Sequence, residues 1–318
     1  MRRNAKWMPV IVSALSLSLL LGGCGETTPV TVDNSSSNES SSDAQENNSS
    51  ATDSAATDSS SADTAADTSS ADAATIEEQV LYDANDIKIT TTGLEDGLMG
   101  TELKLLLENN SAKNITVQAR NANVNGYMVD TMMSVDVAAG KKANDSLTFE
   151  TEGLKECGIE NIASMEFSFA IMDGDTLDDI ASSDVIKLDT SIAATYQQPV
   201  DDSGEVYVDT NGIRIIGKGL STDDSFWGPG VKLYIENNSG QNITVQVRDV
   251  SVNGFMTDSS MSEDVLDGKR AISAVQFYDT DLENNGITEV KDVELSFHVF
   301  NLDAWDDIYD SEVVHMTF

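Results

Sequence analysis

The sequence predicts an all-β protein with two tandem antiparallel β-sandwich domains, and three observations carry this prediction. Residues 108–120, ENNSAKNITVQAR, return as residues 236–248, ENNSGQNITVQVR, with ten of thirteen positions identical at a constant offset of 128. Apolar residues alternate with polar ones through several short runs, and Asn- or Gly-containing turns separate the runs. A period of two is typical of strands with one buried face, and self-similarity at this spacing indicates one module carried twice.

The N-terminus predicts an export signal with a lipid anchor. Arg2, Arg3 and Lys6 precede an apolar run of about 14 residues, which is shorter than the roughly 20 needed to cross a bilayer. The run ends in LGGC at residues 21–24, which resembles the lipobox of bacterial lipoproteins. This resemblance implies a diacylglycerol thioether on Cys24, cleavage just before it, and a place on the extracytoplasmic face of the cell membrane. The alternative is an uncleaved short anchor.

The composition of residues 25–75 predicts a disordered acidic linker. They are mainly Ser, Ala, Thr, Asp and Asn, with ten acids and no Lys, Arg or aromatic residue. Such a composition cannot bury enough apolar surface to offset the entropy lost on ordering. A flexible chain of this length spans about 40 Å, so the linker would hold the folded part away from the lipid surface.

The charge of the whole chain narrows the class of partner. The formal net charge is −37, and the acids outnumber the bases in both repeats. Like charges repel, so we expect no nucleic-acid partner and no anionic membrane face as a docking surface. Cations, basic peptides and neutral glycans remain as partners, and solubility alone is the simpler explanation of the acidity.

Residues 76–200 and 201–318 are the two predicted sandwich domains. Matching strands are expected around residues 87–92 and 213–216, 103–107 and 231–235, 115–119 and 243–247, 147–149 and 275–277, 165–171 and 293–299, and 185–188 and 313–316. The dipeptides Asn125-Gly126 and Asn253-Gly254 are strong hairpin signals, because both residue types tolerate positive φ. Only residues 152–157 and 281–285 suggest a helical turn. Short strands with turns every 8–12 residues are typical of a sandwich.

These turns and strands resemble a known class of module. An early strand ending in Asn-Asn-Ser, a Gly followed by an aromatic residue, a Gly-Lys turn and a late strand through Phe169 or Phe297 occur in the same order in each repeat. The pattern is similar to the uncharacterised immunoglobulin-like repeats of Firmicutes lipoproteins. The resemblance implies tandem immunoglobulin-like sandwiches and no established catalytic residue. The Cys…Trp…Cys set of true immunoglobulin domains is not present.

The sequence offers little catalytic chemistry. Its two histidines, His298 and His315, lie on predicted strands of the second repeat, at the positions that Ala170 and Lys187 occupy in the first. We expect both histidines to be partly exposed. A base and an oriented partner are required for most hydrolytic chemistry, and no nucleophile-elbow, phosphate-loop or zinc motif is present. Cys157 corresponds to Asn285, which favours a tolerated turn position over a reactive thiol. We expect a protein that is not an enzyme and has no cofactor.

One acidic run is a candidate calcium site. Asp173, Asp175, Asp178 and Asp179 lie close together, and Asn301, Asp303, Asp306 and Asp307 take the same places in the second repeat. Several converging oxygens are what Ca²⁺ requires, but the run departs from the helix–loop–helix calcium pattern. Turn hydrogen bonds by Asp are the preferred interpretation. Asp173, Asp175, Asp178, Asp303 and Asp306 remain weak metal candidates.

Polar and aromatic residues supply the candidate binding surfaces. Thr-Gln-Arg triplets at residues 116–120 and 244–248 predict either cross-strand pairing with acids such as Glu166 and Glu294 or a ligand groove. The repeats differ most where Leu98-Met99 becomes Phe226-Trp227 and where Leu177 and Ala181 become Trp305 and Tyr309. Aromatics beside carboxylates are typical of binding surfaces, although plugs of the core are the alternative. Phe226, Trp227, Trp305 and Tyr309 are therefore candidate ligand contacts.

The sequence thus predicts a lipoprotein of the cell surface without catalytic activity. Its duplicated sandwiches would bind or scaffold a protein or glycan of the envelope or of the extracellular space, because a duplicated scaffold with divergent loops suits a binding module. A structural spacer or an accessory subunit of an envelope complex is the alternative.

Overall fold

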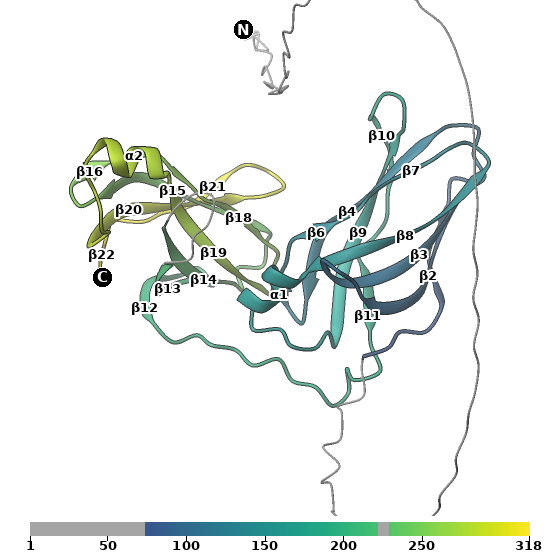
Figure 1. Cartoon of the computed structure of the whole chain (residues 1–318), viewed down its shortest axis with the longest axis horizontal. Coiled ribbons are helices and arrows are strands. Elements are labelled where there is room, and N and C mark those ends of the chain that lie inside the picture. Colours follow the sequence, from purple (N-terminus) through teal and green to yellow (C-terminus); the bar gives the residue numbers. More distant parts are fainter. Residues whose placement is uncertain (1–73, 222–228) are drawn as a thin grey trace, which may run out of the picture. The chain divides into compact units, whose positions relative to one another are not determined.

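The computed structural model describes residues 74–221 and 229–318. Strands dominate both halves, and the all-β prediction is confirmed (Figure 1). The elements of the first half are β1 Gln79–Ala84, β2 Ile87–Asp96, β3 Gly100–Asn109, β4 Ile115–Val124, β5 Tyr127–Met128, β6 Thr131–Met132, β7 Ser134–Val137, β8 Lys141–Glu150, α1 Thr151–Glu156, β9 Ser164–Asp173, β10 Asp179–Ser182 and β11 Ile186–Asp189. Among the described residues, no helix is long and apolar enough to span a bilayer.

The second half repeats this order element by element. Its elements are β12 Glu205–Thr210, β13 Ile213–Ser221, β14 Gly230–Asn237, β15 Ile243–Val252, β16 Phe255–Met256, β17 Ser259–Ser260, β18 Ser262–Val265, β19 Lys269–Phe277, α2 Asp279–Asn284, β20 Asp292–Asn301, β21 Asp307–Asp310 and β22 Val314–Thr317. The one-turn helices α1 and α2 lie where the sequence suggested helical turns.

The strand order is that of an immunoglobulin-like sandwich. In the first half, β2-β3-β8-β6 form one sheet, with β1 added outside β2. The opposing strands are β4, β9 and then β10 and β11, with β5 and β7 on the other side of β4. These two orders correspond to the ABED and CFG sheets of the immunoglobulin fold. The same orders recur as β13-β14-β19-β17 and β15-β20 with β21 and β22.

The core of each half lies between its two sheets. Every second residue of β3 is buried, and the inward-facing residues of β9 and β20 are buried as well. Leu103, Leu105 and Leu107 contribute from β3, and Val293, Leu295 and Phe297 contribute from β20. The alternation in the sequence therefore predicted the buried faces of the central strands correctly.

The two Asn-Gly hairpins form as predicted. Asn125 and Gly126 have φ angles of 52° and 86°, and Asn253 and Gly254 have φ angles of 50° and 83°. Two consecutive positive φ angles are the requirement of the tight hairpin turn that matches strand twist. These turns join β4 to β5 and β15 to β16.

The two sandwiches contact each other through apolar and polar groups, and Ile216 and Tyr234 of the second belong to the buried cluster of the first. β5 of the first pairs with β19 of the second in a single parallel bridge, Tyr127 to Arg270, and the Arg270 amide donates to the Gly126 carbonyl at 2.9 Å. The Lys269 ammonium lies 2.7 Å from the Glu166 carboxylate. The signal and lipobox with Cys24, nearly all of the predicted linker, and Phe226 and Trp227 lie outside the described residues.

Candidate functional site

The most strongly repeated motif has a structural role. Asn109 is fully buried at the end of β3, and its amide donates to the carbonyls of Lys113 and Val137, each at 2.8 Å. Its side-chain oxygen accepts from the Ser111 amide at 3.0 Å and from the Ser111 hydroxyl at 2.7 Å. Asn237 makes the same four bonds at the same distances with Gln241, Val265 and Ser239. The Asn-Asn-Ser motif therefore fixes a turn, which accounts for its repetition without a ligand.

The Thr-Gln-Arg triplets pair across strands, but not with the residues that the sequence suggested. The Thr116 hydroxyl donates to Asp136 at 2.6 Å and the Thr244 hydroxyl donates to Asp264 at 2.6 Å, because β7 and β18 lie beside β4 and β15. Glu166 instead pairs with Lys187 and Lys269, and Glu294 pairs with His315. The expected pairing with Glu166 and Glu294 is therefore wrong.

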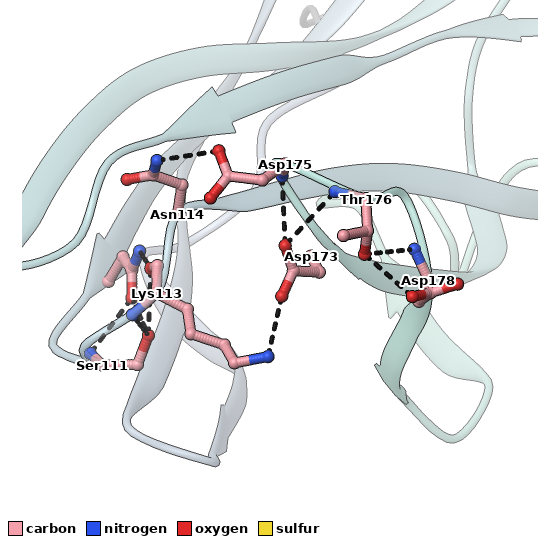
Figure 2. Close-up of polar contacts among 8 residues, drawn as sticks. Ser111, Lys113, Asn114, Asp173, Asp175, Thr176 and Asp178 are labelled. Carbon is pink, nitrogen blue, oxygen red and sulfur yellow. Dashed lines mark hydrogen bonds and ion pairs between the residues drawn. The ribbon is translucent and has the colours of Figure 1, made fainter.

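The acidic run after β9 is a hydrogen-bonded turn (Figure 2). One Asp173 oxygen lies 2.7 Å from the Lys113 ammonium, and the other accepts from the Asp175 and Thr176 amides at 3.1 and 3.4 Å. Asp178 accepts from the Thr176 hydroxyl at 2.9 Å. The hydrogen bond from Lys113 lowers the pKa of Asp173, with help from the amide donors.

Hydrogen bonds of this kind occupy four of the five carboxylates proposed for calcium, those of Asp173, Asp175, Asp178 and Asp303. Asp175 accepts from the Asn114 amide at 3.2 Å, and Asp303 accepts from the Asn242 amide at the same distance. Asp306 is exposed, and its backbone carbonyl closes the turn by accepting from the Asn301 amide at 2.8 Å. Within residues 74–221 and 229–318, no three acidic, His or Cys side chains are arranged to hold a metal ion. Turn formation is the role that the geometry supports for this loop.

The matching loop of the second repeat keeps the turn and replaces the ion pair. Asn301 stands where Asp173 stands, and it accepts from the Asp303 and Ala304 amides at 2.9 and 2.6 Å. Its side-chain amide donates to Gln241 at 2.9 Å, and Gln241 takes the place of Lys113. A neutral amide pair therefore replaces an ammonium–carboxylate pair beside the loop.

An aromatic stack is the feature that sets the second loop apart. Trp305 is 74% exposed at the tip of the loop, and its ring stacks on Phe300 with centroids 5.5 Å apart and planes 21° apart. Phe300 is 7% exposed and lies beside His298, with ring centroids 5.4 Å apart. Trp305 has a φ of 62°, and Leu177 at the same place has a φ of 61°. The loop conformation is thus common to both repeats, while the exposed ring belongs to the second alone.

His298 fixes the base of the stack. It is only 4% exposed, which corrects the expectation of a partly exposed histidine. Its Nδ1 lies 2.7 Å from an Asp310 oxygen and its Nε2 lies 3.5 Å from an Asp307 oxygen. The Arg248 guanidinium also contacts Asp310, at 3.3 Å. β21 pairs with β20 and places Asp310 directly opposite His298, so side chains of the paired strand and the ring of Phe300 surround the imidazole.

We call Trp305, Phe300, His298, Asp307 and Asp310 the Trp305 platform. Of the predicted ligand contacts in the described residues, Trp305 is presented to solvent, whereas Tyr309 pairs with Val299 and packs against the core. Tyr309 is therefore a core contact, and it does not join Trp305 in one surface.

The sequence analysis missed Phe300 as part of this surface. The offset of 128 carries a signal that would have found it, because Ala170, Met172 and Leu177 become His298, Phe300 and Trp305. Only the structure shows that these three changes lie in one stack, because the Trp305 ring lies on Phe300 and Phe300 lies beside His298.

Cys157 is a buried thiol at the end of α1. It is free, and burial raises its pKa to about 12. Asn285, its counterpart after α2, donates its side-chain amide to the Asp281 carbonyl at 2.9 Å. Both residues end a single helical turn, and a thiol held protonated by burial is a poor nucleophile.

Comparisons with known proteins give a distant likeness only. No protein-family model matches the sequence, and no curated protein matches it. The YadV chaperone structure is 11% identical over 73% of this chain and 100% of its own, with a TM-score of 0.23. The complex of the Salmonella enterica SafA pilin with the SafB chaperone matches at 12% identity over 74% and 98%, with a TM-score of 0.22. The CsuC–CsuE chaperone–adhesion subunit complex from Acinetobacter baumannii matches at 10% over 67% and 90%, also at 0.22. The assignment of the fold therefore rests on the strand order described above.

Proposed function

We propose that this chain is a lipoprotein anchored through Cys24 on the outer side of the cell membrane, and that its second sandwich binds a protein or glycan without catalysis. The Trp305 platform is the observation that supports a binding role. The Trp305 ring is large and mostly exposed, so it makes few contacts with the protein interior. Trp is also enriched among the residues that dominate binding energies. Its support by two buried rings limits the entropy lost when a ligand covers it.

The role of binding is favoured over that of a passive spacer by the divergence of the repeats. Both sandwiches keep the same strand order, the same Asn-centred turn bonds and the same loop conformation, so either would serve as a spacer. Only the second places His298, Phe300 and Trp305 at one surface. A cluster of changes at one surface of a retained scaffold is what selection for a ligand would leave.

The binding role is tested with the full chain in detergent on arrays of peptides and of oligosaccharides. Trp305→Leu introduces the residue that the first repeat carries at this place, so the loop conformation is retained. We expect at least one class of probe to lose binding in this variant, while Leu177→Ala in the first repeat retains it. Equal retention of every probe by both variants would leave the spacer or accessory role as the better explanation.

The anchor is tested separately by Cys24→Ser. Loss of the lipobox thiol should move the chain from the detergent phase to the aqueous phase after phase separation. Two or more acyl chains bind durably to a bilayer, so the shift should be close to complete. Mass spectrometry of the native N-terminus without an acyl group would overturn the lipoprotein assignment.

A further inference from the structure

The surroundings of the Trp305 ring are acidic. Exposed carboxylates lie on both sides of it in the sequence, and they belong to Asp303, Asp306, Asp307 and Asp310. In the described residues, the one Arg or Lys side chain paired with these carboxylates is Arg248, 3.3 Å from Asp310, and the His298 ring contacts Asp307 and Asp310. A ligand that reaches the exposed ring therefore enters a field of net negative charge.

An aromatic face and a negative field attract the same kind of group. The π-electrons of Trp attract an ammonium or guanidinium more strongly than those of any other side chain. Nearby carboxylates add Coulomb attraction, which is weak in water at long range but acts within a few ångströms at low salt. An anionic ligand would be repelled, and an uncharged sugar would gain from the ring but not from the field.

The comparison with the first repeat points the same way. There the loop carries Leu177 in place of Trp305, and Lys113 places its ammonium 2.7 Å from Asp173. The first loop therefore has a built-in cation and no ring. The second loop has lost that cation, since Gln241 and Asn301 form a neutral pair, and it has gained the ring. Both differences favour a cation supplied from outside.

We propose that the Trp305 platform binds an organic cation, the side chain of Lys or Arg in a basic segment of a partner protein. This inference rests on the binding role proposed above and names its ligand class. The cation lies against the open face of Trp305, whose other face is covered by Phe300. Asp306 and Asp307 follow Trp305 directly in the chain and are exposed, so we assign their carboxylates to the charge of the bound cation.

The experiment titrates the full chain in detergent with capped tetralysine, with capped tetraglutamine of the same length and with maltotriose as the uncharged sugar. Binding is measured by calorimetry in about 50 mM salt, where exposed charges are less screened than at physiological salt. Tetralysine will also bind to other acidic parts of this chain. The comparison that counts is therefore between Trp305→Leu and Leu177→Ala, which have the same acidic residues.

We expect Trp305→Leu to weaken tetralysine binding about 3- to 30-fold. Leu177→Ala should leave it within twofold of the original chain, and Asp306→Asn should weaken it by a smaller factor than Trp305→Leu. Tetraglutamine and maltotriose should bind at least tenfold more weakly than tetralysine. Circular dichroism of each variant separates loss of a contact from loss of the fold.

Two results would overturn the inference, and they differ in whether they also count against the proposed binding role. Trp305-dependent binding of maltotriose or tetraglutamine with unchanged tetralysine binding would reject the cation while keeping the binding role. Equal affinity of Trp305→Leu and Leu177→Ala for all three probes would reject the cation and count against the binding role as well.

Discussion

Asn237 shows how much one side chain contributes to each sandwich. It is fully buried at the end of β14, and it satisfies the carbonyls of Gln241 and Val265 as well as the amide and hydroxyl of Ser239. A buried polar group that loses its partner costs about 1–3 kcal/mol. The adjacent Asn238 is exposed. One asparagine therefore fixes the turn between β14 and β15, and the other does not contribute to its interior.

We expect Asn237→Ala to lower the free energy of unfolding of the second sandwich by about 3 kcal/mol, because two buried carbonyls lose their donor. Asn238→Ala should change it by no more than about 0.5 kcal/mol. Urea denaturation of both variants, followed by circular dichroism, makes the comparison. Similar midpoints for the two variants would show that the buried amide does not hold the turn.

At the scale of single elements, the central strands could be predicted from the sequence, whereas some edge strands could not. β3, β9 and β20 bury every second residue, so their alternation is visible in the residues alone. β1 and β12 were missed because they are edge strands and most of their residues are exposed. Selection for burial is weak at an edge, and the alternation is correspondingly faint.

Only part of the candidate site could be predicted from the sequence, for a related reason. An outward position on a strand predicts exposure, and His298 occupies such a position on β20. The paired strand β21 supplies Asp307 and Asp310, and Phe300 lies beside the ring, so the imidazole is buried. Exposure on the outer face of a sheet depends on the side chains that neighbouring strands place there. Local sequence does not carry that information, whereas Trp305 on the loop itself was identified as a candidate contact.

The acidic loop after β9 gives a prediction at this scale. Because Asp173 is held by Lys113 and by two turn amides, we expect about 5 mM Ca²⁺ to leave the melting temperature unchanged. A site with a dissociation constant of about 10⁻⁴ M would instead add about 2 kcal/mol to the folded state. Calorimetric scans with Ca²⁺ and with Mg²⁺ at equal ionic strength decide between the two. A rise of several degrees with Ca²⁺ alone would restore the metal site.

At the scale of the whole molecule, the two sandwiches carry the same architecture but differ at one core-facing position of an edge strand. Val135 of β7 is buried, and its counterpart in β18 is Glu263, which lies opposite the buried Val245. An inward-pointing charge on an edge strand is a known way to prevent unwanted pairing. Here it also brings a carboxylate near Asp130 of the first sandwich.

The titration of Glu263 predicts how the stability of the molecule changes with pH. The pKa of Glu263 is raised to about 7, chiefly by burial; a hydrogen bond with Ser273 lowers this pKa, and the carboxylates of Asp130 and Asp264 raise it. The pKa in the folded state thus exceeds that of the unfolded chain, near 4.5. The contribution of this group is therefore fully present below about pH 4.5 and is lost as the pH rises through about 7. The loss amounts to at most about 3 kcal/mol.

We expect Glu263→Gln to match the original chain at pH 4.5 and to exceed it in free energy of unfolding at pH 8, because an amide remains uncharged throughout. Glu263→Val, which introduces the residue of the first repeat, should show the same dependence. Urea midpoints of the three chains at both pH values measure the difference, and titrations common to all three cancel in the comparison. A gap between variant and original that is equal at pH 4.5 and pH 8 would mean that Glu263 ionises as freely in the folded chain as in the unfolded one. The position of Glu263 opposite Val245 would then not lower the free energy of unfolding through its charge.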